Sequence, residues 1–239
     1  MMKKRKLQPP FFEVGPKAYS YGKEIVELAK YADQLTIEYD VRIIVTPQYV
    51  DIPLVARETE NIFVFAQHMD YIPIGRGIGS VLPEALKAAG ADGVFLNHVE
   101  KRLTMNDLIK TISRAKEVGL MTFVCADNID DALIIAKESP TFIVVESPDM
   151  IGGGKTRDQN EYNQITNIEK EIHNVNRDIF LFHGAGINNP QDVFKIILAG
   201  GTGTGSSSAL FLSDDPKKTL KEMIQAVHEA WVIREQKKR

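Results

Sequence analysis

Three ionisable side chains stand where apolar runs of the sequence end. Lys17 follows the first run, His98 follows the fourth, and Glu146 ends the sixth. A lysine, a histidine and a glutamate together suit acid–base chemistry on a small anionic substrate. The sequence therefore predicts an active site wherever the fold brings these three side chains together.

Two segments rich in glycine and other small residues indicate a phosphate site. Residues 184–186 read Gly-Ala-Gly, and residues 204–208 read Thr-Gly-Ser-Ser-Ser. Small residues let backbone N–H groups approach an anion closely. Glycines can also merely turn the chain, and we prefer that interpretation for Gly200-Gly201, which has the pattern of a helix C-cap. For the other two segments we favour phosphate binding.

The segment 147–154 follows Glu146 directly and is rich in proline and glycine. A stiff tip with flexible ends is typical of a lid that closes over a substrate. A flexible surface loop would have the same composition, but the attachment of this segment to a carboxylate at a strand end favours the lid. The expected lid residues are Ser147, Pro148, Ile151, Gly153 and Gly154.

Short apolar runs alternate along the chain with helical patterns. The runs span 10–14, 41–46, 62–66, 93–96, 121–126, 142–146, 179–183 and 203–207. Several are apolar at successive positions, which is typical of strands buried on both faces in a parallel sheet covered by helices. The clearest helical patterns span 22–39, 104–118, 128–138, 188–199 and about 215–235.

Eight strand–helix units in 239 residues predict an α/β fold, a (β/α)8 barrel that forms one domain over residues 1–239. Residues 1–9 are expected to form a basic N-terminal extension. An open doubly wound sheet is the alternative, but it would carry fewer strands and a Gly-rich dinucleotide turn after the first. In a barrel the active site lies at the C-terminal ends of the strands, where Lys17, His98, Glu146 and the two small-residue loops would meet.

The composition excludes several classes of protein. With 26% charged and 44% hydrophobic residues the chain is of ordinary globular type, and a net charge of −3 gives no general attraction to nucleic acid or anionic membranes. No apolar run approaches the roughly 20 residues needed to span a bilayer. The basic start, Met1–Lys6, is not followed by an apolar segment, so we expect no secretion signal. The single cysteine, Cys125, fits a reducing cytoplasm.

The chain resembles the triosephosphate isomerase family, and in particular its shorter archaeal-type branch. Matching stretches run from the first predicted strand to the last loops. They include Lys17-Ala18-Tyr19, residues 66–70, 79–85, 89–93 and 96–102, Glu146 with 147–154, and 183–187. Two patterns in the right order make the resemblance specific. They are Asn-His-x-Glu at 97–100 and Glu-x-Pro-x-x-Ile-Gly-x-Gly at 146–154.

The resemblance implies an aldose–ketose isomerase of glycolysis and gluconeogenesis. It would interconvert dihydroxyacetone phosphate and glyceraldehyde 3-phosphate without metal or cofactor. Glu146 would be the base that moves a proton between adjacent carbons. His98 would be a neutral electrophile, kept uncharged by the N-terminus of a following helix, as the family resemblance implies. Lys17 would offset the charge of the enediolate and the phosphate.

The resemblance also implies supporting residues and an assembly. Glu100 would pair with Lys17 or Arg102, and Asn97 would support the site. The phosphate would receive N–H donors from a set of small residues, Gly152, Ala185 or Gly186, Ser207 and Ser208. Relatives of this kind are homodimers or homotetramers, and the apolar third loop, with Ile74 and Ile78, supports association.

Three positions depart from the family pattern. Residue 15 is usually asparagine and is Gly15 here, residue 99 is usually serine and is Val99 here, and the usual Thr-Gly pair of the third loop is Ile78-Gly79. All three lose a side-chain hydrogen-bonding group together, so the change is coordinated.

These departures leave two other functions open. One is a paralogue that isomerises another phosphorylated sugar, such as a tetrulose phosphate, whose extra carbon a roomier rim would admit. The other is a non-catalytic protein that binds sugar phosphates on the same scaffold. Retention of Lys17, His98 and Glu146 together argues against the second, because binding a phosphate requires the loops but not a base.

Overall fold

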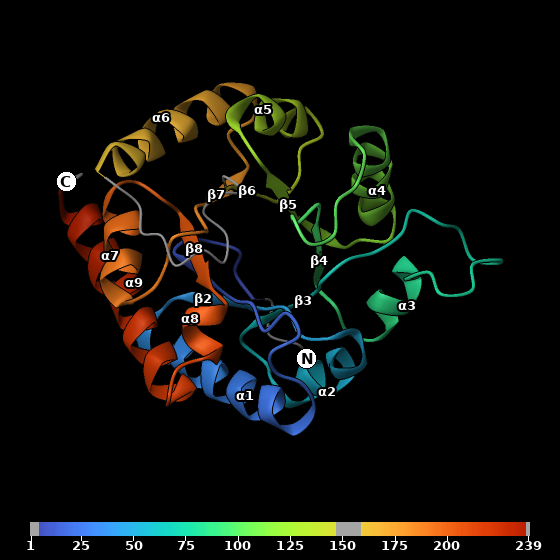
Figure 1. The fold of residues 1–239 in the computed structure, drawn as a ribbon, viewed down its shortest axis with the longest axis horizontal. Coiled ribbons are helices and arrows are strands. Elements are labelled where there is room, and N and C mark those ends of the chain that lie inside the picture. The colour runs from blue at the N-terminus through green and yellow to red at the C-terminus, as the bar shows by residue number, and fades with distance from the viewer. Residues whose placement is uncertain (1–4, 147–158, 238–239) are drawn as a thin grey trace.

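A closed barrel of eight parallel strands forms the centre of the computed structural model, which describes residues 5–146 and 159–237 (Figure 1). The strands pair in chain order, and β8 closes on β1. They are β1 Phe11–Val14, β2 Arg42–Val45, β3 Phe63–Ala66, β4 Gly93–Leu96, β5 Met121–Ala126, β6 Phe142–Val145, β7 Phe180–Phe182 and β8 Gly203–Ser206. Each lies within one predicted run, so the predicted barrel is confirmed.

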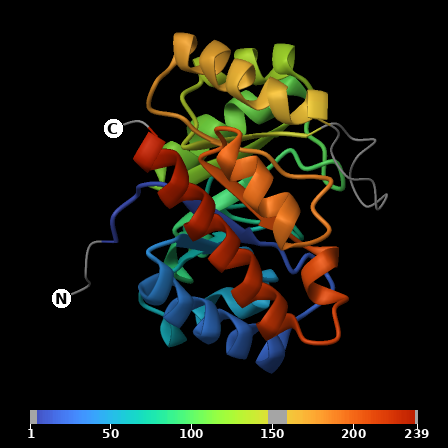
Figure 2. The same ribbon diagram turned by 90° about the vertical axis from the view of Figure 1, so that its left-hand side faces the viewer.

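Helices surround the barrel (Figures 1 and 2). They are α1 Gly22–Tyr39, the 3-10 turn η1 Tyr49–Asp51, α2 Ile52–Glu58, α3 Pro83–Ala88, α4 Met105–Glu117, α5 Ile129–Lys137, α6 Gln159–Val175, α7 Pro190–Leu198, α8 Ser208–Phe211 and α9 Pro216–Lys237. Thr104 and Asn189 cap α4 and α7, each accepting a hydrogen bond from a backbone N–H three residues on. Within the described residues, no helix has the length and apolar character to cross a membrane.

The barrel strands bury both faces. On β1, Phe12 and Val14 pack outward in the large cluster shared with the helices, whereas Phe11 points into the barrel. The interior cluster is aromatic and aliphatic, and consists of Phe11, Ile44, Phe63, Phe65, Phe123, Cys125, Phe142, Val144 and Phe182. Because side chains alternate along a strand, the next inward positions toward the C-terminal end decide what faces the mouth of the barrel.

The opposite, N-terminal end of the barrel is closed by the segment before β1. Arg5 forms an ion pair with Asp92, and its Nη1 lies 2.9 Å from Oδ2 of Asp92. The guanidinium of Arg5 also stacks over Phe63, with its Cζ 5.0 Å from the ring centroid. Asp92 also accepts a hydrogen bond from the backbone N–H of Val64 at 2.8 Å. Leu7 packs against the interior cluster. Residues 5–7, which were expected to belong to a basic extension, are therefore part of the barrel's packing.

The loop between β3 and α3 extends away from the barrel (Figure 1). Ile74 is 74% exposed near its tip, and Ile78 is fully exposed. The loop is tied down nearer its ends, where the Asp70 carboxylate accepts a hydrogen bond from the backbone N–H of Val81 at 2.7 Å.

Candidate active site

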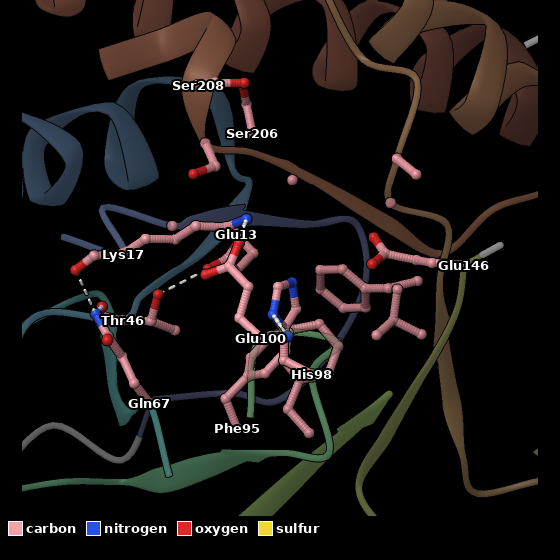
Figure 3. Close-up of a pocket in the computed structure, with 18 of the residues that line it drawn as sticks. Glu13, Lys17, Thr46, Gln67, Phe95, His98, Glu100, Glu146, Ser206 and Ser208 are labelled. Carbon is pink, nitrogen blue, oxygen red and sulfur yellow. Dashed lines mark hydrogen bonds and ion pairs between the residues drawn. The ribbon is translucent and has the colours of Figure 1, made fainter. Parts of the chain in front are cut away.

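A pocket of about 530 Å³ opens at the C-terminal ends of the strands (Figure 3). Lys17, His98 and Glu146 all line it, although they follow β1, β4 and β6. The loops after β7 and β8 form another part of the wall. The tertiary structure thus brings the three predicted ionisable residues and the two small-residue loops to one place.

Lys17 is held in a constrained turn. Its φ of 46° lies in the left-handed region, which residues other than glycine rarely adopt. Two amides fix the turn, because Gln48 and Gln67 both donate to the Lys17 carbonyl, at 2.6 and 2.9 Å. The Lys17 ammonium group lies 2.7 Å from Oε1 of Glu100. The site-facing lysine is therefore positioned through its backbone and its side chain.

Glu100 pairs with Lys17 rather than with Arg102, which forms an ion pair with Asp127 at 2.6 Å. Burial alone would raise the pKa of Glu100. The hydrogen bond and the positive charge of Lys17 outweigh this effect and lower the pKa below its ordinary value. Glu100 is therefore a stable anionic partner for Lys17.

His98 is directed by a tight turn at the end of β4. Asn97 adopts a φ of 61°, its amide donates to the Cys125 carbonyl at 3.0 Å, and its side-chain oxygen accepts from the N–H of Leu103 at 3.0 Å. Asn97 does not line the pocket, so it supports the turn from outside it. The Glu100 N–H donates to Nδ1 of His98 at 3.2 Å.

An imidazole nitrogen that accepts a hydrogen bond carries no proton, so the Glu100 N–H favours neutral His98 with its hydrogen on Nε2. The pKa of His98 is lowered to about 4, mainly by burial. The positive charge of Lys17 also lowers this pKa, and its effect is larger than the opposite effect of the Glu100 carboxylate. The Glu100 N–H that donates to His98 belongs to a turn and not, as expected, to the N-terminus of the following helix, because α4 begins only at Met105. His98 can therefore donate a hydrogen bond into the pocket without carrying charge.

Glu146 continues the pairing of β6 with β5, because its N–H donates to the Ala126 carbonyl at 3.0 Å. Its carboxylate lies directly over Gly184. A Cβ atom at residue 184 would be 1.4 Å from Oε1 of Glu146, so only glycine leaves room for the carboxylate in this position. Gly184, which the sequence pattern places in a phosphate loop, therefore also shapes the position of the predicted base.

The predicted phosphate-binding residues after β7 and β8 gather on the pocket wall. Ala185 and Gly186 line the pocket with φ values of 50° and 65°, and Ser207 and Ser208 line it at the start of α8. A left-handed alanine is unusual and indicates a backbone held in a required conformation. Gly152 and the lid residues Ser147, Pro148, Ile151, Gly153 and Gly154 lie outside the described residues.

Glu13 is an acidic pocket residue that the sequence analysis did not single out. It lies within β1 and points inward, two residues after Phe11. The sequence holds a signal for it, because Glu13 is a charged residue inside an apolar strand, two positions after Phe11, and residues two apart face the same side of a strand. Its carboxyl lies 2.8 Å from the place where a Cβ of residue 15 would be. The expected roomier rim is therefore wrong at Gly15, since Glu13 fills the space.

Comparisons with known proteins agree with this geometry. The family model described as triosephosphate isomerase matches residues 14–226. The triosephosphate isomerase of Methanobacterium bryantii is 37% identical over 208 residues, which are 87% of this chain and 92% of that protein. That of Sulfolobus acidocaldarius is 34% identical over 221 residues, 92% of this chain and 95% of that protein. This chain belongs to the triosephosphate isomerase family.

Membership of the triosephosphate isomerase family confirms the resemblance drawn from the motifs. The protein of Methanothermus fervidus is a third such relative, 38% identical over 205 residues, 86% of this chain and 92% of that protein. These relatives are matched over nearly their full length, which supports the archaeal-type branch. The family match includes Lys17, His98 and Glu146 and begins one residue after Glu13.

Proposed function

We propose that this chain interconverts dihydroxyacetone phosphate and glyceraldehyde 3-phosphate through an enediolate. The observation that carries the proposal is the meeting of Glu146, His98 and Lys17 at one pocket that small-residue loops also line. Proton transfer between adjacent carbons needs a base, a donor to the substrate oxygens and compensation of negative charge. The names of the archaeal relatives favour the triose over a longer sugar.

Each residue has a role that follows from its surroundings. The Glu146 carboxylate removes a proton from one carbon and returns it to the next. The Nε2–H of neutral His98 donates to the two substrate oxygens in turn, because its Nδ1 is occupied by the Glu100 N–H. Lys17, held by Glu100, offsets the charge of the enediolate. These steps use only side chains of the protein, so the proposal requires no metal and no cofactor.

The phosphate group is assigned to the small-residue loops. Backbone N–H groups of Ala185 or Gly186, Ser207 and Ser208 can approach it closely, because these residues carry little or no side chain into the pocket. On the sequence pattern, Gly152 supplies a further donor and the segment 147–154 closes over the substrate. Closure would exclude water and suppress loss of phosphate from the enediolate.

A coupled assay with glyceraldehyde 3-phosphate and dihydroxyacetone phosphate tests the function, with Glu146→Gln as the decisive variant. Loss of the base should lower kcat by about 10³-fold and change KM by only a few-fold. Glu24→Gln, on the exposed side of α1, is the matched control and should retain wild-type rates.

Four-carbon ketose phosphates belong in the same assay. A preference for one of them by more than about tenfold in kcat/KM, or about 1.4 kcal/mol, would contradict the proposal and support the paralogue. Phosphate-competitive binding without turnover of any substrate would support a binding protein.

We also propose that the chain forms a homodimer or homotetramer in the cytoplasm. Exposed Ile74 and Ile78 on the long β3–α3 loop support association, because such side chains are usually covered. Light scattering should give a mass of two or four chains for the wild type and a smaller mass for Ile78→Asp. A monomeric wild type would exclude the assembly without touching the proposed chemistry.

A further inference from the structure

The proposed mechanism leaves one acidic group of the pocket without a role. Glu13 lines the pocket from β1, one layer above the phenylalanine cluster that fills the barrel. Figure 3 draws it near the centre of the site, with its contact to Thr46 as a dashed line. A carboxyl group in such a place needs an explanation, because burying a charge on an apolar floor is costly.

The backbone on both sides of Glu13 is shaped to accommodate its carboxyl. A Cβ at Gly15 would lie 2.8 Å from Oε1, and a Cβ at Gly205 would lie 2.8 Å from Oε2. Gly205 is also the direct partner of Glu13 across the β1–β8 pair. Because side chains at either position would displace the carboxyl, the two glycines give it a defined place and leave it open to the pocket.

The surroundings of Glu13 favour the protonated acid. The Thr46 hydroxyl donates to Oε1 at 2.8 Å, which is a neutral contact and supplies no positive charge. Charged and titratable groups act on it from three directions: Lys17 after β1, Cys125 on β5 and Glu146 after β6. Lys17 is already paired with Glu100, and Glu146 repels a second negative charge.

Burial raises the pKa of Glu13 to about 8, with Glu146 adding to the rise while Thr46 and Lys17 oppose it. Part of Glu13 stays accessible because it lines the pocket. The site thus holds two carboxyl groups with different tasks available to them. Glu146 can act as a base, and Glu13 carries a proton that it can donate in a hydrogen bond.

We propose that Glu13 is a further catalytic residue, whose protonated carboxyl donates a hydrogen bond to the substrate oxygen that gains negative charge during the isomerisation. This inference rests on the proposed function. No covalent bond changes at Glu13, which keeps its proton throughout. The Thr46 hydroxyl, donating to Oε1, leaves the proton to Oε2, which lies beside the open backbone of Gly205. Glu13 then completes, with His98 and Lys17, a set of three donors around the reacting end.

Two variants of Glu13 separate donation from space filling. Glu13→Gln keeps the size, stays neutral and retains N–H donors, so kcat should stay within about fivefold of wild type. Glu13→Ala removes the donor and should lower kcat by about 10²-fold, the usual cost of one such donor. The inhibition constant of inorganic phosphate should stay within twofold of the wild-type value in both variants, because the phosphate site lies on other loops.

The pH dependence gives a readout that a packing role would not move. In the wild type, kcat/KM should fall above pH about 8 as Glu13 loses its proton, and Glu13→Gln should lack this fall. Thr46→Val removes a hydrogen bond that lowers the pKa of Glu13, so it should shift the fall to higher pH, whereas Thr46→Ser should not.

The outcomes distinguish this inference from the function itself. Triose turnover that is unchanged in Glu13→Ala would overturn the role of Glu13 and leave the proposed function intact. If Glu13→Gln is folded yet as slow as Glu13→Ala, the donor role is also overturned. If the wild type shows no turnover, calorimetry with dihydroxyacetone phosphate decides. Weaker binding in Glu13→Ala supports the contact, and equal or absent binding excludes it.

Discussion

The two ends of the barrel use the same strands for opposite purposes. At the N-terminal end and in the interior, inward positions hold aromatic side chains such as Phe11, Phe142 and Phe182. The rings of Phe11 and Phe142 pack edge to face, with their centroids 5.1 Å apart. At the C-terminal end the inward positions are Glu13, two residues after Phe11, Gly184, two residues after Phe182, and Glu146, two residues after the interior Val144 of β6. A step of two residues along a strand thus changes its contribution from packing to chemistry.

Left-handed backbone at residues other than glycine occurs at both ends of the barrel, but in different surroundings. At the mouth, Lys17, Asn97 and Ala185 hold left-handed conformations, and side-chain amides pin two of these turns. At the closed end, Arg5 and Asp92 join the segment before β1 to the start of β4. The left-handed residues at the closed end, Asp40 and Ser139, stand where helices α1 and α5 end, whereas those at the mouth belong to the loops that carry the site.

Glycine-to-alanine substitutions at the two ends should have different consequences. The larger effect is expected at the mouth, where the substitution lowers activity. Gly184→Ala places a Cβ 1.4 Å from the present position of Glu146 Oε1. The carboxylate is the flexible end of a side chain and can move away at little cost in stability. We expect kcat/KM to fall by about 10²-fold, or about 2.7 kcal/mol, because the base is displaced.

Steady-state kinetics and thermal unfolding measured on the same Gly184→Ala preparation check this expectation. The melting temperature should stay within a few degrees of wild type. Wild-type kinetics in the variant would mean that Glu146 does not work from the position over Gly184.

Gly203→Ala should show the converse, a loss of stability with little loss of activity in the folded molecules. A Cβ at residue 203 would lie 2.6 Å from the ring of Phe182, which is fully enclosed and cannot move aside. Overpacking of this kind costs about 1–3 kcal/mol in the free energy of unfolding. Urea denaturation measures the cost, and a variant as stable as wild type but inactive would contradict the division between the two ends.

The smallest expected effect is on the pH dependence of stability, and it arises from the protonation of His98 at the mouth of the barrel. The pKa of His98 in the folded protein, about 4, lies below its ordinary value, so the unfolded chain binds more protons between these two values. Stability contributed through this group therefore rises with pH over that window, and lowering the pH from 7 to 5 should cost on the order of 1–2 kcal/mol.

Nuclear magnetic resonance of the imidazole should show His98 neutral down to about pH 5. His98→Gln should remove this part of the pH dependence of stability. An imidazole that takes up a proton near pH 6.5 would contradict the neutral electrophile.

Much of the fold was predictable from local sequence. The continuous apolar runs and the helical patterns at 22–39, 104–118, 128–138 and 188–199 are short-range features, and the strands and the helices α1, α4, α5 and α7 formed within them as predicted. The one-turn helix α8 was not predicted, since four residues are too few to show helical periodicity.

The candidate site was predictable in part. Lys17, His98 and Glu146 were recognisable because each stood at a strand end within a motif. Glu13 was not, because it lies within an apolar strand instead of at a strand end, and barrel closure is what brings its inward side chain to the pocket.

The number and order of the strands, the strand ends at which polar residues collect, and the family could all be inferred from the amino-acid sequence alone. These depend on periodicity and motifs, which are written along the chain. The three-dimensional packing was needed to show that Glu100 pairs with Lys17, that Gly184 and Gly205 make room for two carboxyl groups, and that Glu13 lines the same pocket as Glu146. Those outcomes depend on distances between residues far apart in sequence and on the loss of water around them, and closure of the barrel sets both.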